Sequence, residues 1–324
     1  MTLLLDAVTL QEVLDVQASI GELRTACQEQ ADDLVTMPPR QTVDARDGRG
    51  WLRISMAFLN GSGFMGFKAM NRAPGIGMRY IVGLYEIGSG ELVAMMDADA
   101  VTTQRTAATN ALGTHLLAPA GETTVGILGS GVQARALLRA YAHLRRLDHV
   151  YVHSPRREAR EDCAAWARRD LQVEATAVDD PAQLAESSPV TVVALRASST
   201  PVYRTEWLRP GGHVTGLSSV RPEAREVEEA VWPACDVIVV DDRSSVEVSG
   251  DGHATGGADL SALPELWELV AGRVGRTSDG QRTMFKSSGN ALQDIAVAIG
   301  AYRRARAMGL GQDLGPFPTT KPYA

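Results

Sequence analysis

The sequence predicts an α/β protein in which a Rossmann-type domain with a parallel sheet is joined to a mixed α+β domain. Three observations lead to this prediction. The chain has 324 residues, more than the roughly 100–200 residues of one typical domain. Residues 43–97 consist of short apolar runs separated by turn clusters, whereas residues 123–242 alternate apolar strands with helical segments. Apolar strands alternating with helices are typical of a parallel sheet covered on both faces.

The first half begins with a helix and continues as a sheet. Residues 9–31 carry apolar side chains at helical spacing, which predicts one amphipathic helix. The runs WLRISMAF, GFMGFKAM, MRYIVGLYEI and ELVAMMDA are separated by NGSG, RAPGIG and GSG, so we expect an antiparallel sheet. Residues 102–117 are helical again. They end before Ala118-Pro119-Ala120-Gly121, where we place the domain boundary, with residues 1–118 in the first domain.

The second half alternates regularly between strands and helices. The predicted strands are TTVGILG, HVYVHS, VEATAV, PVTVVAL, GGHVTGL and CDVIVVDD. The predicted helices between them are VQARALLRAYAHLRRL, RREAREDCAAWARRD, PAQLAES and EAREVEEAVW. NALQDIAVAIGAYRRARAMGL then predicts a long amphipathic helix that stops at Gly309 and Gly311.

The bulk properties argue against several classes of protein. The net charge of −7 is not that of a nucleic-acid binder, which would show a basic domain or stripe. No window of about 18 apolar residues occurs, so nothing should span a membrane. Three cysteines without a CxxC pair argue against disulfides and zinc, and the histidines lack partners at ligand spacing. We expect a cytoplasmic enzyme that acts on a small molecule and binds no metal.

The stretch Gly129-Ser130-Gly131-Val132-Gln133-Ala134 fits the dinucleotide-binding pattern G-x-G-x-x-[GA]. The first glycine allows the tight turn, the second lets the backbone approach a pyrophosphate, and the small third residue lets the helix pack on its strand. The free N–H groups and the positive end of the helix favour phosphates. Glycines after a strand are often a plain turn, but here a strand precedes, a helix follows, and a second strand ends at Ser154.

The end of that second strand indicates which nicotinamide cofactor binds. NAD enzymes usually have an acidic side chain there for the ribose 2′-hydroxyl. This chain has Ser154, Arg156 and Arg157 instead. Arginine suits a 2′-phosphate, because the two form paired charge-assisted hydrogen bonds. We therefore predict NADP, with NAD as the alternative if both arginines are merely solvated at a helix start.

Three cations in the first half lack obvious acidic partners in the sequence: Arg40 in MPPR, Lys68 inside the apolar run GFMGFKAM, and Arg105 in a helix of small residues. A lysine in a buried strand is costly unless something pairs with it. Each cation alone has a plausible structural role. Together they predict a clamp for the carboxylate of a substrate.

The three cations and the glycine-rich loop, together with several other motifs in the same order, resemble the ornithine cyclodeaminase/mu-crystallin family. The similarity covers nearly the whole chain. The motifs that carry it are MPPR (37–40), GFKAM (66–70), RTAATNAL (105–112), LGSGVQA (128–134), RPGGHVTGL (209–217), VVDD (239–242) and GRTSDGQRTMFKSSGNALQD (275–294).

The resemblance implies a substrate-binding and dimerisation domain, to which residues 295–324 return, and a Rossmann domain over residues 119–294. It implies a homodimer that oxidises amino acids, reduces imines, or cyclises ornithine with loss of ammonia. It also implies roles for individual residues. Arg40, Lys68 and Arg105 would hold the substrate carboxylate, and Val132 and Gln133 would meet the pyrophosphate. Gly216, Leu217, Ser218, Ser287 and Ser288 would border the nicotinamide and the substrate.

One departure from the family bears on the reaction. The cyclodeaminases place an aspartate where this chain has Ser218, and a hydroxyl provides neither a general base nor a counter-charge for a second ammonium. We therefore predict a dehydrogenase or imine reductase that transfers hydride between nicotinamide and the Cα of a 2-amino or 2-imino acid, with Lys68 as a candidate proton donor. The alternatives are a cyclodeaminase using a displaced acid such as Glu226 or Asp241, and a non-catalytic NADP-dependent binder resembling mu-crystallin.

Two other residues have open interpretations. Arg196 follows an expected strand and would touch the cofactor or a second acidic group of the substrate, such as that of a dicarboxylate. Asp294, in the last motif, is expected to cap or orient a helix. The methionines of the strand-like runs are expected in the core or in a dimer interface.

Overall fold

The computed structural model describes residues 1–73, 75–195, 199–217 and 222–321. The chain divides into two compact units, one formed by Met1–Arg105 with Asn290–Ala324 and the other by Thr106–Gly289. The division falls inside α3 (Ala98–Leu117), before the segment expected from the Pro/Gly residues. The later part of α3 packs in the second unit, where Thr114 Oγ1 lies 2.7 Å from Thr215 Oγ1.

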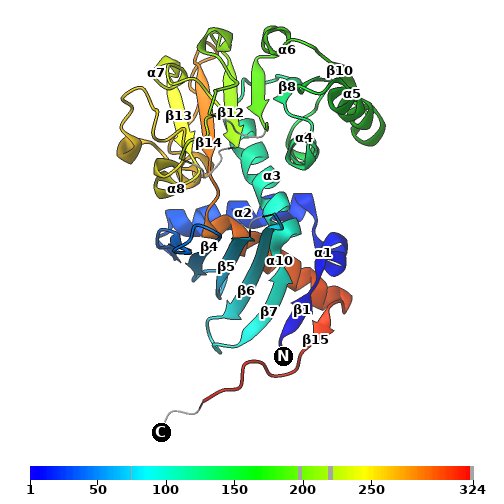
Figure 1. The fold of residues 1–324 in the computed structure, drawn as a ribbon, viewed down its shortest axis with the longest axis vertical. Helices are drawn as coiled ribbons and strands as arrows, with labels where there is room; N and C mark the ends of the chain where they lie inside the picture. Colours follow the sequence, from blue (N-terminus) through cyan, green and yellow to red (C-terminus); the bar gives the residue numbers. More distant parts are fainter. Residues whose placement is uncertain (74, 196–198, 218–221, 322–324) are drawn as a thin grey trace. The chain divides into compact units, whose positions relative to one another are not determined.

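The first unit contains an eight-stranded sheet in the order β15-β1-β7-β6-β5-β4-β2, with β3 also paired to β4 (Figure 1). Its strands are β1 (Leu3–Leu5), β2 (Val35–Thr36), β3 (Gln41–Asp44), β4 (Trp51–Leu59), β5 (Phe64–Ala73), β6 (Gly77–Glu86), β7 (Leu92–Asp97) and β15 (Gln312–Asp313). Strands β3 to β7 pair antiparallel, which confirms the predicted sheet. The prediction missed β1, β2 and β15, which have only two or three residues and are too short to show a period of two.

The helices of this unit differ from the prediction at one point. α1 (Ala7–Val13) and α2 (Val16–Ala31) replace the single helix predicted over residues 9–31. The break occurs because the Asp15 side chain caps α2, accepting a hydrogen bond from Ala18 N at 2.7 Å. α10 (Ala291–Met308) packs on α2 and on β4, β5 and β6. It ends as predicted at Gly309, whose φ of 67° favours glycine.

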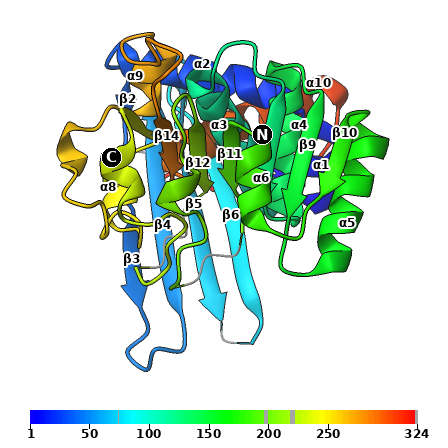
Figure 2. The ribbon, with the colours of Figure 1, turned by 90° about the horizontal axis from the view of Figure 1, so that it is seen from above.

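The two faces of this sheet differ. On β4, Ala57 and Leu59 are fully buried, whereas Leu52, Met56 and Phe58 alternate with them and are 39–45% exposed. Figure 2 shows β4, β5 and β6 side by side. The register places Met65 and Phe67 of β5 beside Phe58 and Met56. We call this second, apolar side the outer face of the sheet.

The second unit contains a seven-stranded parallel sheet in the order β10-β9-β8-β11-β12-β14-β13. Its strands are β8 (Thr124–Leu128), β9 (His149–His153), β10 (Glu174–Ala177), β11 (Val190–Val193), β12 (His213–Leu217), β13 (Val237–Val240) and β14 (Thr283–Ser287). All six predicted strands are present, which confirms the Rossmann-type fold. β14 was missed because its run TMFKS contains a lysine and two hydroxyl residues, which hide the apolar pattern of a buried strand.

The helices of the second unit connect these strands. They are α4 (Val132–Leu144), α5 (Arg157–Trp166) with a π-helical extension (Ala167–Leu171), α6 (Pro181–Ser187), α7 (Val231–Ala234), α8 (Arg243–Glu247) and α9 (Leu266–Val270), with 3₁₀ turns at Thr205–Trp207 and Leu260–Ala262. The helix predicted over EAREVEEAVW is wrong except for its last turn. Asp251 instead holds this segment by accepting hydrogen bonds from the backbone N–H groups of Glu226 and Val227.

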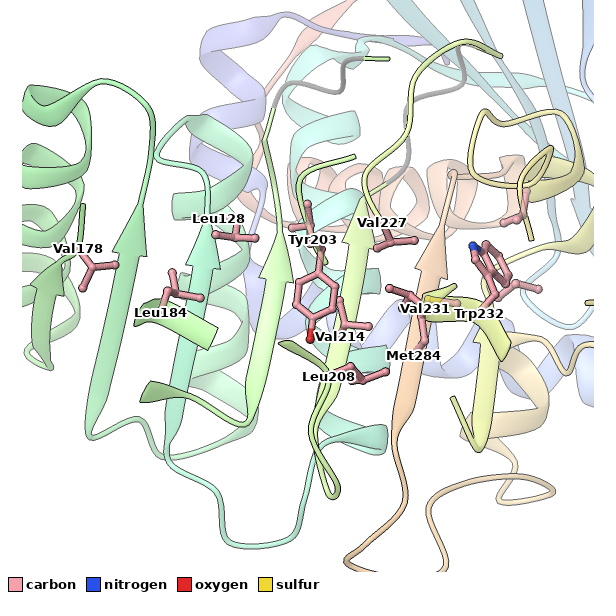
Figure 3. Packing of buried hydrophobic residues seen from close by; sticks show 13 residues of the cluster. Leu128, Val178, Leu184, Tyr203, Leu208, Val214, Val227, Val231, Trp232 and Met284 are labelled. Carbon is pink, nitrogen blue, oxygen red and sulfur yellow. The ribbon is translucent and has the colours of Figure 1, made fainter. Parts of the chain in front are cut away.

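The core of the second unit is built from the large apolar side chains shown in Figure 3. Tyr203, Leu208 and Val214 lie together over β12, and Val231, Trp232 and Met284 lie toward β14 and β13. None of the helices in the described parts of the chain is long and apolar enough to cross a membrane.

Candidate functional site

A buried ionic cluster lies on the helix-covered face of the first unit. Lys68 of β5 points its Nζ at Asp294 Oδ2, 2.7 Å away, and Arg105 of α3 places its Nε 2.9 Å from Asp294 Oδ1. Arg105 also donates a hydrogen bond to Gln293 Oε1 at 3.1 Å. The three charged residues are at most 8% exposed.

This cluster corrects two expectations. Lys68 and Arg105 do have an acidic partner, Asp294, which sequence reasoning missed because α10 brings it from the far end of the chain. Asp294 does not cap α10, because Asn290 fills that role by accepting a hydrogen bond from Gln293 N. The available signal was a lone carboxylate in the apolar helical run ALQDIAVAI. A charge there needs a partner in the interior.

The cluster holds more positive than negative charge, since two cations share one carboxylate. Burial lowers the pKa of Lys68 to about 8; Asp294 raises it, while Arg105 and Arg40 lower it further. Lys68 therefore stays charged at neutral pH but loses its proton more readily than an exposed lysine.

Arg40 lies next to this cluster. It directly precedes Gln41 of β3, which pairs with Ile54, and the next residue of β4, Ser55, pairs with Lys68. Its charge is close enough to lower the pKa of Lys68. The structure thus brings the three cations predicted to form the clamp into one region of the first unit.

In the second unit, the glycine-rich loop joins β8 to α4 as predicted. Gly129 has a φ of 137°, and a Cβ on it would lie 2.4 Å from the Ala194 carbonyl oxygen, so only glycine fits. Gly131 caps α4, and an added Cβ there would meet open space. Val132 and Gln133 form the first turn of α4, and Ala134 is fully buried against the sheet.

A cavity of about 710 Å³ opens over this loop. It is lined by Gly129, Ser130, Gly131, Arg135, Ser154, Pro155, Arg156, Ala159, Asp162, Ala194, Leu195 and Val202. Bare glycine backbone, the N-terminus of a 13-residue helix and a cavity of this size fit the pyrophosphate of a dinucleotide.

The predicted specificity residues take different positions in this cavity. Ser154 and Arg156 line it. Arg157 instead pairs with Glu161 along the exposed side of α5, with Nε 2.7 Å from Oε1. Within the lining, Arg135 pairs with Asp162 at 2.5 Å. Arg156 is thus the better placed of the two predicted arginines.

The remaining predicted residues lie at the ends of β12 and β14. Gly216 packs so tightly that an added Cβ would lie 2.6 Å from Lys286 Nζ, and Leu217 follows it. Ser287 donates its hydroxyl to Asp241 at 2.9 Å. The Ser288 hydroxyl is buried without a hydrogen-bond partner in the described part of the chain. Arg196 and Ser218 lie outside the described residues.

The two acids considered for a cyclodeaminase are both engaged within the second unit. Glu226 Oε2 lies 2.5 Å from Lys286 Nζ, and Asp251 Oδ2 lies 2.7 Å from the same nitrogen. Burial raises the pKa of Glu226 to about 7; Lys286 lowers it and Asp251 raises it. Asp241 accepts the backbone N–H groups of Ser288 and Gly289 as well as the Ser287 hydroxyl.

Comparison with known proteins gives a consistent result. The model of the ornithine cyclodeaminase/mu-crystallin family matches residues 1–309. An uncharacterized cyclodeaminase of Sinorhizobium fredii is 31% identical over 302 residues, covering 86% of this chain and 87% of the relative. The structure of Thermococcus litoralis Δ1-pyrroline-2-carboxylate reductase with NADH and L-proline has a TM-score of 0.89 and 26% identity, covering 96% of this chain and 100% of that one. An archaeal alanine dehydrogenase dimer with bound NAD has a TM-score of 0.88 and 26% identity, covering 98% and 99%.

Proposed function

The chain belongs to the ornithine cyclodeaminase/mu-crystallin family, and from this premise we propose that it is a nicotinamide-dependent oxidoreductase of amino or imino acids. It transfers a hydride between nicotinamide and the Cα of a 2-amino or 2-imino acid. The relatives solved with NADH and L-proline, and with NAD, support this activity. The observation that carries the proposal is the buried cluster of Lys68, Asp294 and Arg105 with its surplus of positive charge.

The surplus charge suits a substrate carboxylate. Lys68, Arg105 and Arg40 bind it through charge-assisted hydrogen bonds, which are stronger than neutral ones. Asp294 positions two of these cations and leaves one of their two charges uncompensated. Because Asp294 already holds the two cations together, less reorganisation is needed to receive the anion.

When bound, nicotinamide supplies or accepts the hydride. Reduction of an imine also consumes one proton, which ends on the nitrogen of the product amine. Lys68 Nζ donates this proton in our proposal, because a buried ammonium with a pKa of about 8 is charged at neutral pH and a ready donor. In the direction of oxidation, neutral Lys68 takes the proton back from the amine.

For the cofactor, we propose NADP in preference to NAD. Ser154 and Arg156 line the cavity where the 2′-phosphate of the adenosine ribose would lie, and the one acid among the described lining residues, Asp162, is paired with Arg135. Fluorescence titration with NADPH and NADH tests this. Arg156→Ala should weaken NADPH binding about tenfold, as expected for one charged hydrogen bond, and leave NADH binding unchanged. Tighter binding of NADH by the unaltered protein would reverse the assignment.

For the assembly, we propose a homodimer formed through the outer face of the sheet. The exposed Leu52, Met56 and Phe58, with Met65 and Phe67 beside them, form a contiguous apolar surface of the kind buried between subunits. The related alanine dehydrogenase was solved as a dimer. Sedimentation of the protein and of Phe58→Glu should show a dimer and a monomer, respectively. The cytoplasmic location remains a prediction.

Product analysis separates the proposed reaction from its alternatives. Net change in nicotinamide absorbance with amino acids, or with 2-oxo acids plus ammonia, supports the oxidoreductase. Conversion of ornithine to proline and ammonia with catalytic cofactor would instead establish a cyclodeaminase, in which Glu226 or Asp241 would have to leave its contacts with Lys286 or Ser287 to act as the base. Tight nicotinamide binding without turnover of any substrate would establish a binding protein.

A further inference from the structure

A further cation, Arg53, lies on the same face of the sheet as Lys68 of the buried ionic cluster. Ser55 of β4 pairs directly with Lys68 of β5, and Arg53 precedes Ser55 by two residues. Because side chains alternate along a strand, Arg53 and Lys68 share one face. They are diagonal neighbours, whose backbones lie about 7–8 Å apart, within reach of long side chains.

The row of residues that contains Arg53 borders the cluster. Arg53 pairs with Met70, and Met70 pairs with Tyr80 of β6. Burial raises the pKa of Tyr80; the charge of Asp99 also raises it, and those of Arg105 and Asp294 act on it as well, which indicates that the phenol lies near the cluster. Arg53, Met70 and Tyr80 form a row across three strands, and all three are half-buried. This row lies two residues along the strands from the buried Lys68.

The Arg53 guanidinium is held in place by two neighbours, but one of its nitrogens makes no hydrogen bond in the described residues. Its Nε donates a hydrogen bond to Thr42 Oγ1 at 2.8 Å, and its carbon lies 5.1 Å from the centroid of the Trp51 ring. One terminal nitrogen is buried and has no hydrogen-bond partner in the described residues. Burial lowers the pKa of this guanidinium, and Asp44, whose charge raises it, makes no ion pair with Arg53 within 4.0 Å. A buried, unsatisfied N–H of a charged group is costly, so its retention calls for a ligand.

We propose that Arg53 binds a second anionic group on the side chain of the substrate, so that the preferred substrates are 2-amino or 2-imino dicarboxylic acids. This inference rests on the proposed function, because it places the first carboxylate at Lys68 and Arg105. The planar guanidinium, which lies over Trp51 and is fixed by Thr42, carries the fork of N–H donors that suits a carboxylate. The same charge repels the second ammonium of a diamino acid.

The test compares substrates that differ in the charge of the side chain. With NADP and NAD, kcat/KM is measured for L-aspartate and L-glutamate against L-alanine and L-ornithine, in the protein and in Arg53→Met. We expect the unaltered protein to prefer an acidic substrate over L-alanine by at least about tenfold, since a hydrogen bond to a charged group contributes about 1.5–3 kcal/mol. Arg53→Met should lower kcat/KM for the acidic substrate about 10–100-fold and leave L-alanine unchanged.

Arg46→Met is the matched control, because it removes an exposed arginine from the turn between β3 and β4. It should leave the preference intact. Equal kcat/KM for L-alanine and the acidic substrates in the unaltered protein would overturn the proposal. So would an equal loss for all substrates in Arg53→Met.

A binding measurement keeps this inference distinct from the proposed activity. Trp51 lies against Arg53, so succinate should change tryptophan fluorescence in the complex with cofactor, and propionate should bind more weakly. Loss of the succinate signal in Arg53→Met supports the second anion site, whether or not any substrate turns over. Absence of turnover would contradict only the proposed reaction. Equal binding of succinate by both proteins would overturn the Arg53 site alone.

Discussion

Two lysines, one in each unit of the chain, are buried to a similar degree but have opposite ionic surroundings. Lys68 shares a single carboxylate with a second cation, Arg105. Lys286 lies between two carboxylates, those of Glu226 and Asp251. The first cluster therefore carries a surplus of positive charge and the second a surplus of negative charge.

The surroundings set the acidity of each ammonium. Burial lowers the pKa of Lys68 to about 8. Burial also acts to lower the pKa of Lys286, but Asp251 and Glu226 outweigh it and raise this pKa above its usual value. Burial alone thus does not make a lysine reactive, because the sign of the nearest charges decides whether its proton can leave. We conclude that the first cluster is suited to ligands and proton transfer, and the second to holding the fold.

The largest effect should come from breaking the second cluster. Lys286→Met leaves two buried carboxylates without their cation, which typically costs about 3–5 kcal/mol. We expect the free energy of unfolding in urea to fall by this amount. Lys321→Met, in the exposed C-terminal segment, is the control and should change nothing. Unchanged stability of Lys286→Met would show that this cluster does not hold the fold.

Breaking the first cluster should instead impair turnover. Lys68→Met removes a preorganised positive charge, a change that costs about 10²–10³-fold in rate at comparable sites. Steady-state kinetics should show this loss in kcat/KM, whereas unfolding should change less than in Lys286→Met, because Asp294 keeps Arg105 as a partner. A Lys68→Met protein with full activity would remove the clamp from the mechanism.

The pH dependence sharpens the contrast between the two lysines. If Lys68 donates the proton, it must be protonated, so kcat/KM for reduction should fall as pH rises through about 8, approaching about tenfold per pH unit. Oxidation should rise over the same range, since it needs the neutral amine. The profile is measured in both directions. If kcat/KM of Lys68→Met still falls near pH 8, the titration belongs to another group.

The smallest expected change is a shift in the pH at which kcat/KM for reduction falls. Asp294 raises the pKa of Lys68, so Asp294→Asn should move this fall to a lower pH while leaving a proton donor in place. The same pH profile measures the shift. Movement to higher pH would mean that the neighbouring cations do not govern Lys68, and thermal unfolding checks that the variant is folded.

Most strands and the glycine-rich turn of the second unit could be predicted, because the patterns that specify them lie within short stretches of sequence. The turn at Gly129 and the apolar strands around it are encoded by neighbouring residues, and the structure reproduces them. The failures involve distant partners. The helix predicted through Glu226 was wrong because Asp251, outside the segment, holds its backbone. The pairing of Asp294 with Lys68 was missed because only the fold of α10 over β5 brings them together.

Chemical labelling of amines can report on the first cluster, because lysine is scarce in this chain. The chain has only three lysines, Lys68, Lys286 and Lys321, and arginine supplies its other cationic side chains. Amine-directed acylating reagents should therefore modify Lys321 readily and spare Lys286, which is 0% exposed. Burial of Lys68, which is 4% exposed, slows access of the reagent, but its lowered pKa leaves more of the neutral, reactive amine. Lys68 should therefore react more than Lys286, and carboxylate ligands should shield it. Peptide mass mapping would then report occupancy of this pocket without any enzymatic assay.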